Sequence, residues 1–235
     1  MKIKLITLII FTVIFALGLT VASKIKPAQP QEPDNNRLDW HVQKAKKEGR
    51  TQVEIPAPIV EYLGTDDSEN PKVALSAYTV VVAEPVATKT YEQNGNELIS
   101  WTKFKTTEAL SDLRPSRCPN CNSLVPPPEM LPVLEGEFLL PQVGGSIVKD
   151  GVRITEKRGN YPFYVNGQKY LMLVSIEPSG IAFTAGGPVG VFKLDEKENL
   201  IPLNDEPHSI KNEIKRTYQN SLKTLRLKSK SEASS

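Results

Sequence analysis

The chain has 235 residues, of which 24% are charged and 39% hydrophobic, and it carries a formal net charge of +2. This length suits one domain with appendages, and its core does not need dense disulfides. Residues 207–235 hold seven basic and two acidic residues, a net charge of +5, whereas residues 24–206 carry −5. An acidic main body argues against nucleic-acid binding, which uses basic faces with aromatic residues, so we expect no nucleic-acid partner.

The first 23 residues have the three parts of a secretory signal. Lys2 and Lys4 make a basic start, residues 5–22 are apolar, and a small-residue exit at Ala22–Ser23 offers a cleavage site. The apolar run exceeds the usual signal core of roughly 7–15 residues and approaches the ~20 that span a bilayer. A cleaved signal peptide and a retained signal anchor are therefore both open. Either one places residues 24–235 outside the cytoplasm, because the basic end stays inside.

A linker and a small helical region follow the signal. Residues 24–36 contain three prolines and little to bury, which predicts a flexible linker. Residues 37–71 are predicted to hold a short, polar surface helix that Asn36 can cap, then a brief strand and an acidic loop. The acidic run of this loop lacks the alternating ligands of a calcium site, so we expect it to be solvated; it consists of Asp66, Asp67 and Glu69.

Residues 72–206 are predicted to form the main domain, built from β-strands. The first block is rich in β-branched residues and has Asn94-Gly95 near its middle, which favours a hairpin because both turn positions tolerate positive φ. Leu98 and Ile99 are both apolar, and Trp101 and Phe104 fall on opposite faces. This change of phase predicts a β-bulge or burial on both sides.

The second block, residues 137–203, alternates short apolar runs with turn residues. The run KYLMLVSI, residues 169–176, has no polar face, which predicts a central strand covered on both sides. Short strands at about ten-residue spacing favour a barrel or a sandwich. Two glycine pairs, Gly144-Gly145 and Gly186-Gly187, are expected to supply positive φ at turns or bulges. Turns are also predicted at Asp150-Gly151, at Asn166-Gly167 and near Lys197–Asn199.

Residues 207–235 are predicted to form a basic amphipathic helix followed by a disordered tail at 228–235. Apolar residues recur every three or four positions, and Ser209 is available as an N-cap. We expect the apolar stripe to pack on the β-domain; the alternative is contact between the basic face and anionic lipid. The stripe consists of Ile210, Ile214, Tyr218, Leu222 and Leu225.

Four short motifs occur in order between residues 72 and 203. They are VVV in a strand pair, a Gly-Gly step before DGV, the strand GQKYLML and the closing GVFKL. This order resembles a group of uncharacterised secreted bacterial proteins with small closed barrels of the OB type, including netrin-like and metalloproteinase-inhibitor-like modules. The resemblance implies a mainly β fold: a small closed antiparallel OB-like barrel with short flanking α-helices. Such inhibitors use an N-terminal cysteine and several disulfides, which this chain lacks, so inhibitory activity is not carried over.

Both cysteines lie in a proline-rich loop, residues 111–136, between the two β blocks. Outside the cytoplasm two thiols this close normally oxidise, so we predict a disulfide between Cys118 and Cys121. A ring this small contributes at most about 2 kcal/mol, so its role would be to stiffen the loop. One alternative is a redox pair, which needs a helix N-terminus at the first cysteine. Another is half of a zinc site, which needs further ligands. The third is that the thiols are free or paired between chains.

The two histidines, His41 and His208, lie in the flanking segments and are expected to be solvated or lightly packed. No nucleophile-elbow, Walker A, zinc-protease or EF-hand pattern occurs in the sequence. We therefore expect no catalytic residues, no metal site and no cofactor.

These features favour a non-enzymatic, secreted or membrane-tethered binding or assembly module of the bacterial cell envelope. Its expected partner is an envelope protein or ligand, and residues 5–22 would contact the inner membrane if they are retained. The alternative is an extracytoplasmic thiol–disulfide enzyme, or another envelope enzyme, that uses Cys118 and Cys121.

Overall fold

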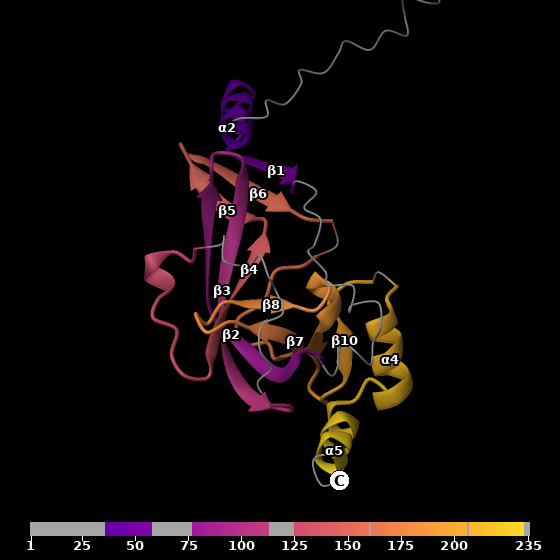
Figure 1. Ribbon diagram of the computed structural model, residues 1–235. Coiled ribbons are helices and arrows are strands. Elements are labelled where there is room, and N and C mark those ends of the chain that lie inside the picture. Colours follow the sequence, from indigo (N-terminus) through magenta and orange to yellow (C-terminus); the bar gives the residue numbers. More distant parts are fainter. Residues whose placement is uncertain (1–35, 58–76, 113–124, 160, 206, 233–235) are drawn as a thin grey trace, which may run out of the picture. The chain divides into compact units, whose positions relative to one another are not determined.

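Two β-sheets dominate the part of the chain that the computed structural model describes (Figure 1). This part comprises residues 36–57, 77–112, 125–159, 161–205 and 207–232, and it belongs to a unit that begins at Asn35. The prediction of a mainly β protein with short flanking helices is confirmed for these residues. The signal segment, the acidic run of residues 66–69 and both cysteines lie outside the described residues.

The described residues form three α-helices and ten strands. The helices are α2 (Arg37–Lys47), α4 (Ser209–Tyr218) and α5 (Leu222–Glu232), with short 3₁₀ helices η3 (Pro128–Met130) and η4 (Gly187–Gly190). The strands are β1 (Gln52–Pro56), β2 (Thr79–Gln93), β3 (Glu97–Ala109), β4 (Glu137–Val143), β5 (Gly145–Lys149), β6 (Val152–Lys157), β7 (Tyr170–Ile176), β8 (Ala182–Thr184), β9 (Val191–Leu194) and β10 (Leu200–Pro202). The smaller sheet has the order β1-β6-β5, and the larger one has the order β10-β9-β7-β2-β3-β4, with β8 paired to β7.

Strand β7 is a central strand of the larger sheet. It pairs antiparallel with β2 on one side and with β8 and β9 on the other. Leu171 and Leu173 pack into the cluster on one face, and Tyr170, Met172 and Val174 pack into the cluster on the opposite face. The prediction of a strand covered on both sides is confirmed.

The larger sheet is not closed, so the predicted closed OB-like barrel is not confirmed. Between β4 and the start of β8 there is one isolated bridge, Leu139 to Ile181, and the Leu139 N–H donates to the Gly180 carbonyl at 2.8 Å. Closure needs a continuous hydrogen-bond ladder around the ring. Strand β8 has only three residues before the chain turns into η4, so it is too short to build that ladder.

Strands β2 and β3 form a long hairpin that contributes residues to each apolar cluster of the described residues. Its turn places Asn94 and Gly95 at φ 52° and 72°, as the Asn-Gly step predicts. Leu98 packs against α2, whereas Ile99 packs on the opposite side. The change of phase at these two residues therefore reflects two-sided burial. The register shifts of this hairpin lie elsewhere, next to Val82 and next to Pro85.

Helix α2 packs with the smaller sheet at the tip of this hairpin (Figure 1). Asn36 precedes the helix but makes no side-chain cap, contrary to the prediction. The hairpin turn accepts hydrogen bonds instead, from Arg37 N to Asn96 Oδ1 at 3.2 Å and from Leu38 N to the Gly95 carbonyl at 3.1 Å. The cluster beneath the helix consists of Leu38, Val42, Ala45, Val53, Ile55, Leu98, Val152 and Ile154.

The C-terminal segment packs its apolar residues against the larger sheet. It forms two helices where one is predicted, because Gln219 and Asn220 adopt positive φ of 53° and 52° and end α4. The N-cap is His208, whose Nδ1 accepts from Ile210 N at 3.2 Å, and not Ser209. Helix α5 continues to Glu232, so residues 228–232 are helical and the predicted disorder from residue 228 is wrong for them.

Candidate functional site

A groove of about 690 Å³ runs between α5 and the strand ends of the larger sheet. Its apolar part comes from buried Val82, Leu194 and Leu222 and from Ile201, which is 46% exposed. Its polar part comes from the end of β3, from the chain before β7 and from the turn between β9 and β10. The polar and glycine lining is Thr107, Glu108, Gly167, Gln168, Lys169, Lys193, Asp195, Glu196, Glu198 and Arg226.

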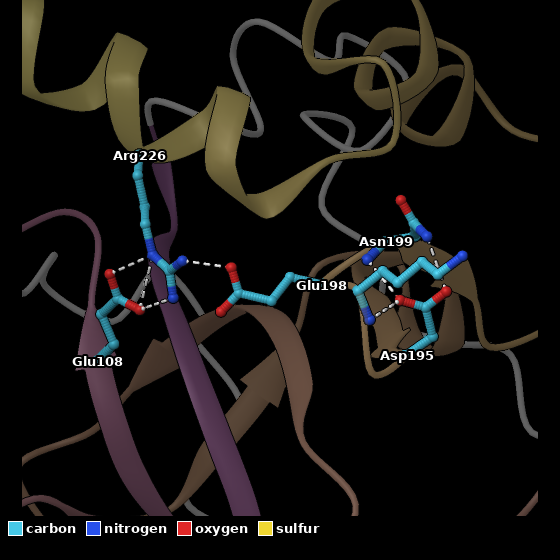
Figure 2. A network of polar contacts seen from close by, with 6 residues as sticks. Glu108, Asp195, Glu198, Asn199 and Arg226 are labelled. Atoms are coloured by element: carbon cyan, nitrogen blue, oxygen red, sulfur yellow. Dashed lines mark hydrogen bonds and ion pairs between the residues drawn. The ribbon is translucent and has the colours of Figure 1, made fainter.

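Arg226 of α5 joins two carboxylates across this groove (Figure 2). Its guanidinium binds Glu108 with two parallel bonds, from Nε to Oε1 at 2.8 Å and from Nη2 to Oε2 at 2.6 Å. Its Nη1 donates to Glu198 Oε2 at 2.6 Å. The hydrogen bonds to Glu108, and then those to Glu198, raise the pKa of Arg226 above its ordinary value. Since these side chains are about a third to half exposed, the bridge positions α5 more than it stabilises the fold.

The turn that presents Glu198 is held by Asp195 (Figure 2). Asp195 Oδ1 accepts from Lys197 N at 2.9 Å and from Asn199 N at 2.8 Å, and its Oδ2 accepts from Asn199 Nδ2 at 2.8 Å. These bonds, the Asn199 side chain first, lower the pKa of the Asp195 carboxyl. Glu198 has φ 61°, an uncommon conformation for a residue other than glycine. The turn is therefore fixed by its own hydrogen bonds, at the place where the sequence predicts a turn.

The remaining charged residues of the groove are exposed. Lys169, Lys193 and Glu196 form no ion pair or hydrogen bond through their charged groups within the described part of the chain. The groove thus offers both signs of charge beside an apolar floor. Such a surface can hold a polypeptide segment by contacts of several kinds, as protein interfaces do.

A second polar cluster lies at the hairpin tip, between α2 and the smaller sheet. The carboxylate of Glu156 is fully buried there and accepts from Arg37 Nη1 at 2.5 Å and from Leu98 N at 2.6 Å. These contacts tie α2, the hairpin and β6 together.

The residues that the sequence singles out lie apart from the groove or outside the described residues. Cys118 and Cys121 belong to residues 113–124, which the structure does not describe, so the predicted disulfide stays a prediction. His41 makes an edge-to-face contact with Trp40 at 4.8 Å between ring centroids, and His208 caps α4. Gly144 and Gly145 are buried and have φ of 102° and 146°.

Sequence reasoning missed the groove because its key residues are far apart in the chain. Glu108 and Arg226 are 118 positions apart, and no local pattern links them. The feature of the sequence that could have pointed to the groove is the basic face of the C-terminal segment. In the structure one of its cations, Arg226, faces protein carboxylates.

Among the described residues, no group of three or more histidine, cysteine, aspartate or glutamate side chains is arranged to hold a metal ion. None of the helices described there has the length and apolar character that crossing a bilayer requires. Comparison with protein-family models, with curated proteins and with solved structures finds no significant match to this chain.

Proposed function

We propose that this chain is a non-enzymatic binding or assembly module of the bacterial cell envelope, and that the groove beneath α5 contacts a segment of a partner protein. The placement outside the cytoplasm is supported by the basic start and apolar run of residues 1–23. A cleaved signal would release the module, and a retained one would tether it through residues 24–36. N-terminal sequencing of the exported protein distinguishes the two.

The observation that carries the binding role is the construction of the groove. Both carboxylate oxygens of Glu108 and of Asp195, and Oε2 of Glu198, accept hydrogen bonds from neighbouring groups, so the walls are fixed before any partner arrives. A preorganised surface loses little conformational entropy on binding. Ile201 adds an apolar side chain that is almost half exposed at the same place.

A photo-cross-linking amino acid placed at chosen positions of the full chain tests this role in cells of the native host. We expect position 201, in the groove, to cross-link to a discrete envelope protein. Position 148 is the matched control, because Val148 is exposed to 62% but lies on β5, outside the groove. Replacing Arg226 by alanine frees α5 from Glu108 and should lower the yield at position 201. Equal yields at both positions, or no product at position 201, would contradict the proposal.

A further inference from the structure

Strand β1 is an edge of the smaller sheet, and its outer side is open (Figure 1). Its ladder to β6 begins with the Arg153 N–H, which donates to the Thr51 carbonyl, and ends with the Ala57 N–H, which donates to β6; both bonds are 2.8 Å long. The backbone groups of alternate residues therefore point toward β6, and those of Gln52 and Glu54 point away from it. Within the described part of the chain, the N–H and C=O groups of these two residues make no backbone hydrogen bond.

The other edge strands of the two sheets are protected. Each edge of the larger sheet contains a proline, Pro202 in β10 and Pro141 in β4, which has no N–H to donate. The Leu200 N–H of β10 also donates to the turn before α5 at 2.7 Å, and the Leu139 N–H of β4 donates to the segment before β8 at 2.8 Å. Strand β5 begins against the hairpin, at Gly145. Proteins close sheet edges in such ways to prevent pairing, so the open side of β1 stands out.

The outward groups of β1 are complementary to those of a second, antiparallel β1. With a two-fold axis at Val53, Gln52 lies opposite the partner's Glu54, and each such pair exchanges two N–H···O=C bonds. The two pairs together give four hydrogen bonds. The pairing ends at Pro56, because this residue has no N–H and its carbonyl already accepts from Arg37 Nη2.

The side chains along β1 also suit this arrangement. Val53 is 8% exposed, the most exposed member of the buried cluster beneath α2. On the axis it faces the partner's Val53 in a non-hydrogen-bonded pair, where side chains approach most closely, so the apolar cluster continues across the axis. The Glu54 carboxylate lies 2.7 Å from Lys157 Nζ and would face the uncharged side chain of Gln52. Like charges, which destabilise directly opposed strands, are therefore not opposed.

We propose that β1 is a self-association edge, through which two copies of this chain pair antiparallel and join their three-stranded sheets into one continuous sheet. The proposal does not depend on the groove, which lies beneath α5. One short strand makes a small interface, so the pairing is weak in dilute solution and is favoured where copies are concentrated.

Sedimentation velocity of the full chain, with detergent micelles in molar excess, measures the association. We expect the protein mass to rise with concentration toward that of a dimer. Glu54→Pro removes one outward N–H from each copy and leaves the ladder to β6 intact, so it should weaken association by roughly tenfold or more. Glu54→Ala is the matched control, because it removes the same side chain but keeps the N–H, and its effect should be much smaller. A monomer at every concentration, or equal weakening in both variants, overturns the proposal.

A photo-cross-linking amino acid at position 52 tests the same pairing without a proline in the strand. In cells of the native host, we expect a covalent dimer of the full chain whose cross-link maps to residues 52–56 of the second copy. Position 148 is the control and should give no such dimer, because Val148 is exposed on β5, at the opposite edge of the same sheet. A cross-link from position 52 to a different protein, or to another part of the second copy, would rule out self-pairing through β1.

Discussion

At the scale of single residues, the fold depends on a few charged side chains that are held by backbone as well as by counter-charges. Arg37 illustrates this, since it binds a carboxylate and two carbonyls on three different segments. A buried ion pair gains little overall when it replaces well-packed apolar groups, but loss of one partner leaves the other charge buried and unpaired. The stability of the α2 end is therefore most sensitive to Arg37 and Glu156.

We expect Arg37→Ala to lower the free energy of unfolding by about 3–5 kcal/mol, because the fully buried carboxylate of Glu156 would lose its cation. Urea denaturation followed by circular dichroism measures the loss. Arg153→Ala is the control, since Arg153 is an exposed arginine of β6 that makes no ion pair within the described residues, and it should change stability by less than about 0.5 kcal/mol. Equal losses in the two variants would contradict a structural role for Arg37.

The residues that build the polar cluster at the hairpin tip and the groove could not be predicted from sequence patterns. Arg37 and Glu156 are 119 positions apart, and Arg226 and Glu108 are 118 positions apart. Periodicity reports on neighbours within one helix or strand and says nothing about pairs at such distances. The sequence indicated only that the C-terminal segment is basic, not that one of its cations faces the protein.

At the scale of elements, close packing at one strand start fixes how the smaller sheet meets the hairpin. Gly145 begins β5 with φ 146°, next to Thr90 of β2 and Ser100 of β3. Those two hydroxyls contact each other at 2.8 Å, and Ser100 Oγ donates to the Gly144 carbonyl at 2.7 Å. A Cβ at position 145 would overlap both side chains, so only glycine fits there.

Gly145→Ala should therefore destabilise the protein by roughly 2–4 kcal/mol, as overpacking and an unfavourable φ act together. Gly151→Ala separates the two effects, because Gly151 also has positive φ (79°) but nothing lies within 4 Å of its added Cβ. It should cost only about 1 kcal/mol. Thermal denaturation of both variants checks the difference, and a smaller loss at position 145 than at 151 would show that the contact with Thr90 and Ser100 can relax.

Elements with strong local signals were predictable, and those set by tertiary context were not. The all-apolar run of β7 and the Asn94-Gly95 turn are encoded within a few residues, and both predictions are confirmed. The break between α4 and α5 has no such signal, because Gln219 and Asn220 are polar residues on an otherwise continuous helical pattern. Barrel closure depends on how far β8 runs along β4, and neither strand shows this in its own sequence.

At the scale of the whole described unit, the β2–β3 hairpin links every apolar cluster. Val82 belongs to the cluster under the C-terminal helices and Phe104 to the one on the opposite face of the larger sheet. Leu98 packs with α2, and Trp101 packs with Met130 of η3. Since each cluster loses contacts if the hairpin opens, the elements should unfold together.

The two tryptophans test this cooperativity, because Trp40 lies on α2 and Trp101 lies on β3. In Trp101→Phe the fluorescence reports on α2, and in Trp40→Phe it reports on the sheet. We expect the urea midpoint from fluorescence to match the midpoint from far-ultraviolet circular dichroism in each variant, even though Trp101→Phe itself lowers stability. A Trp40 transition that clearly precedes loss of the sheet signal would show that α2 is a separate folding unit.

The parallel pairing of β1 with β6 bears on the order in which the chain matures during synthesis. Gln52 pairs with Arg153, so β1 cannot pair until β6 has been synthesised, roughly a hundred residues later. Non-local pairing of this kind is slow and leaves apolar surface uncovered in the meantime. Leu38, Val42 and Ile55 emerge early but are buried only after β6 has been made. The N-terminal end of the domain is thus the first to be synthesised and the last to be completed, which makes it the natural place for a chaperone to bind the nascent chain.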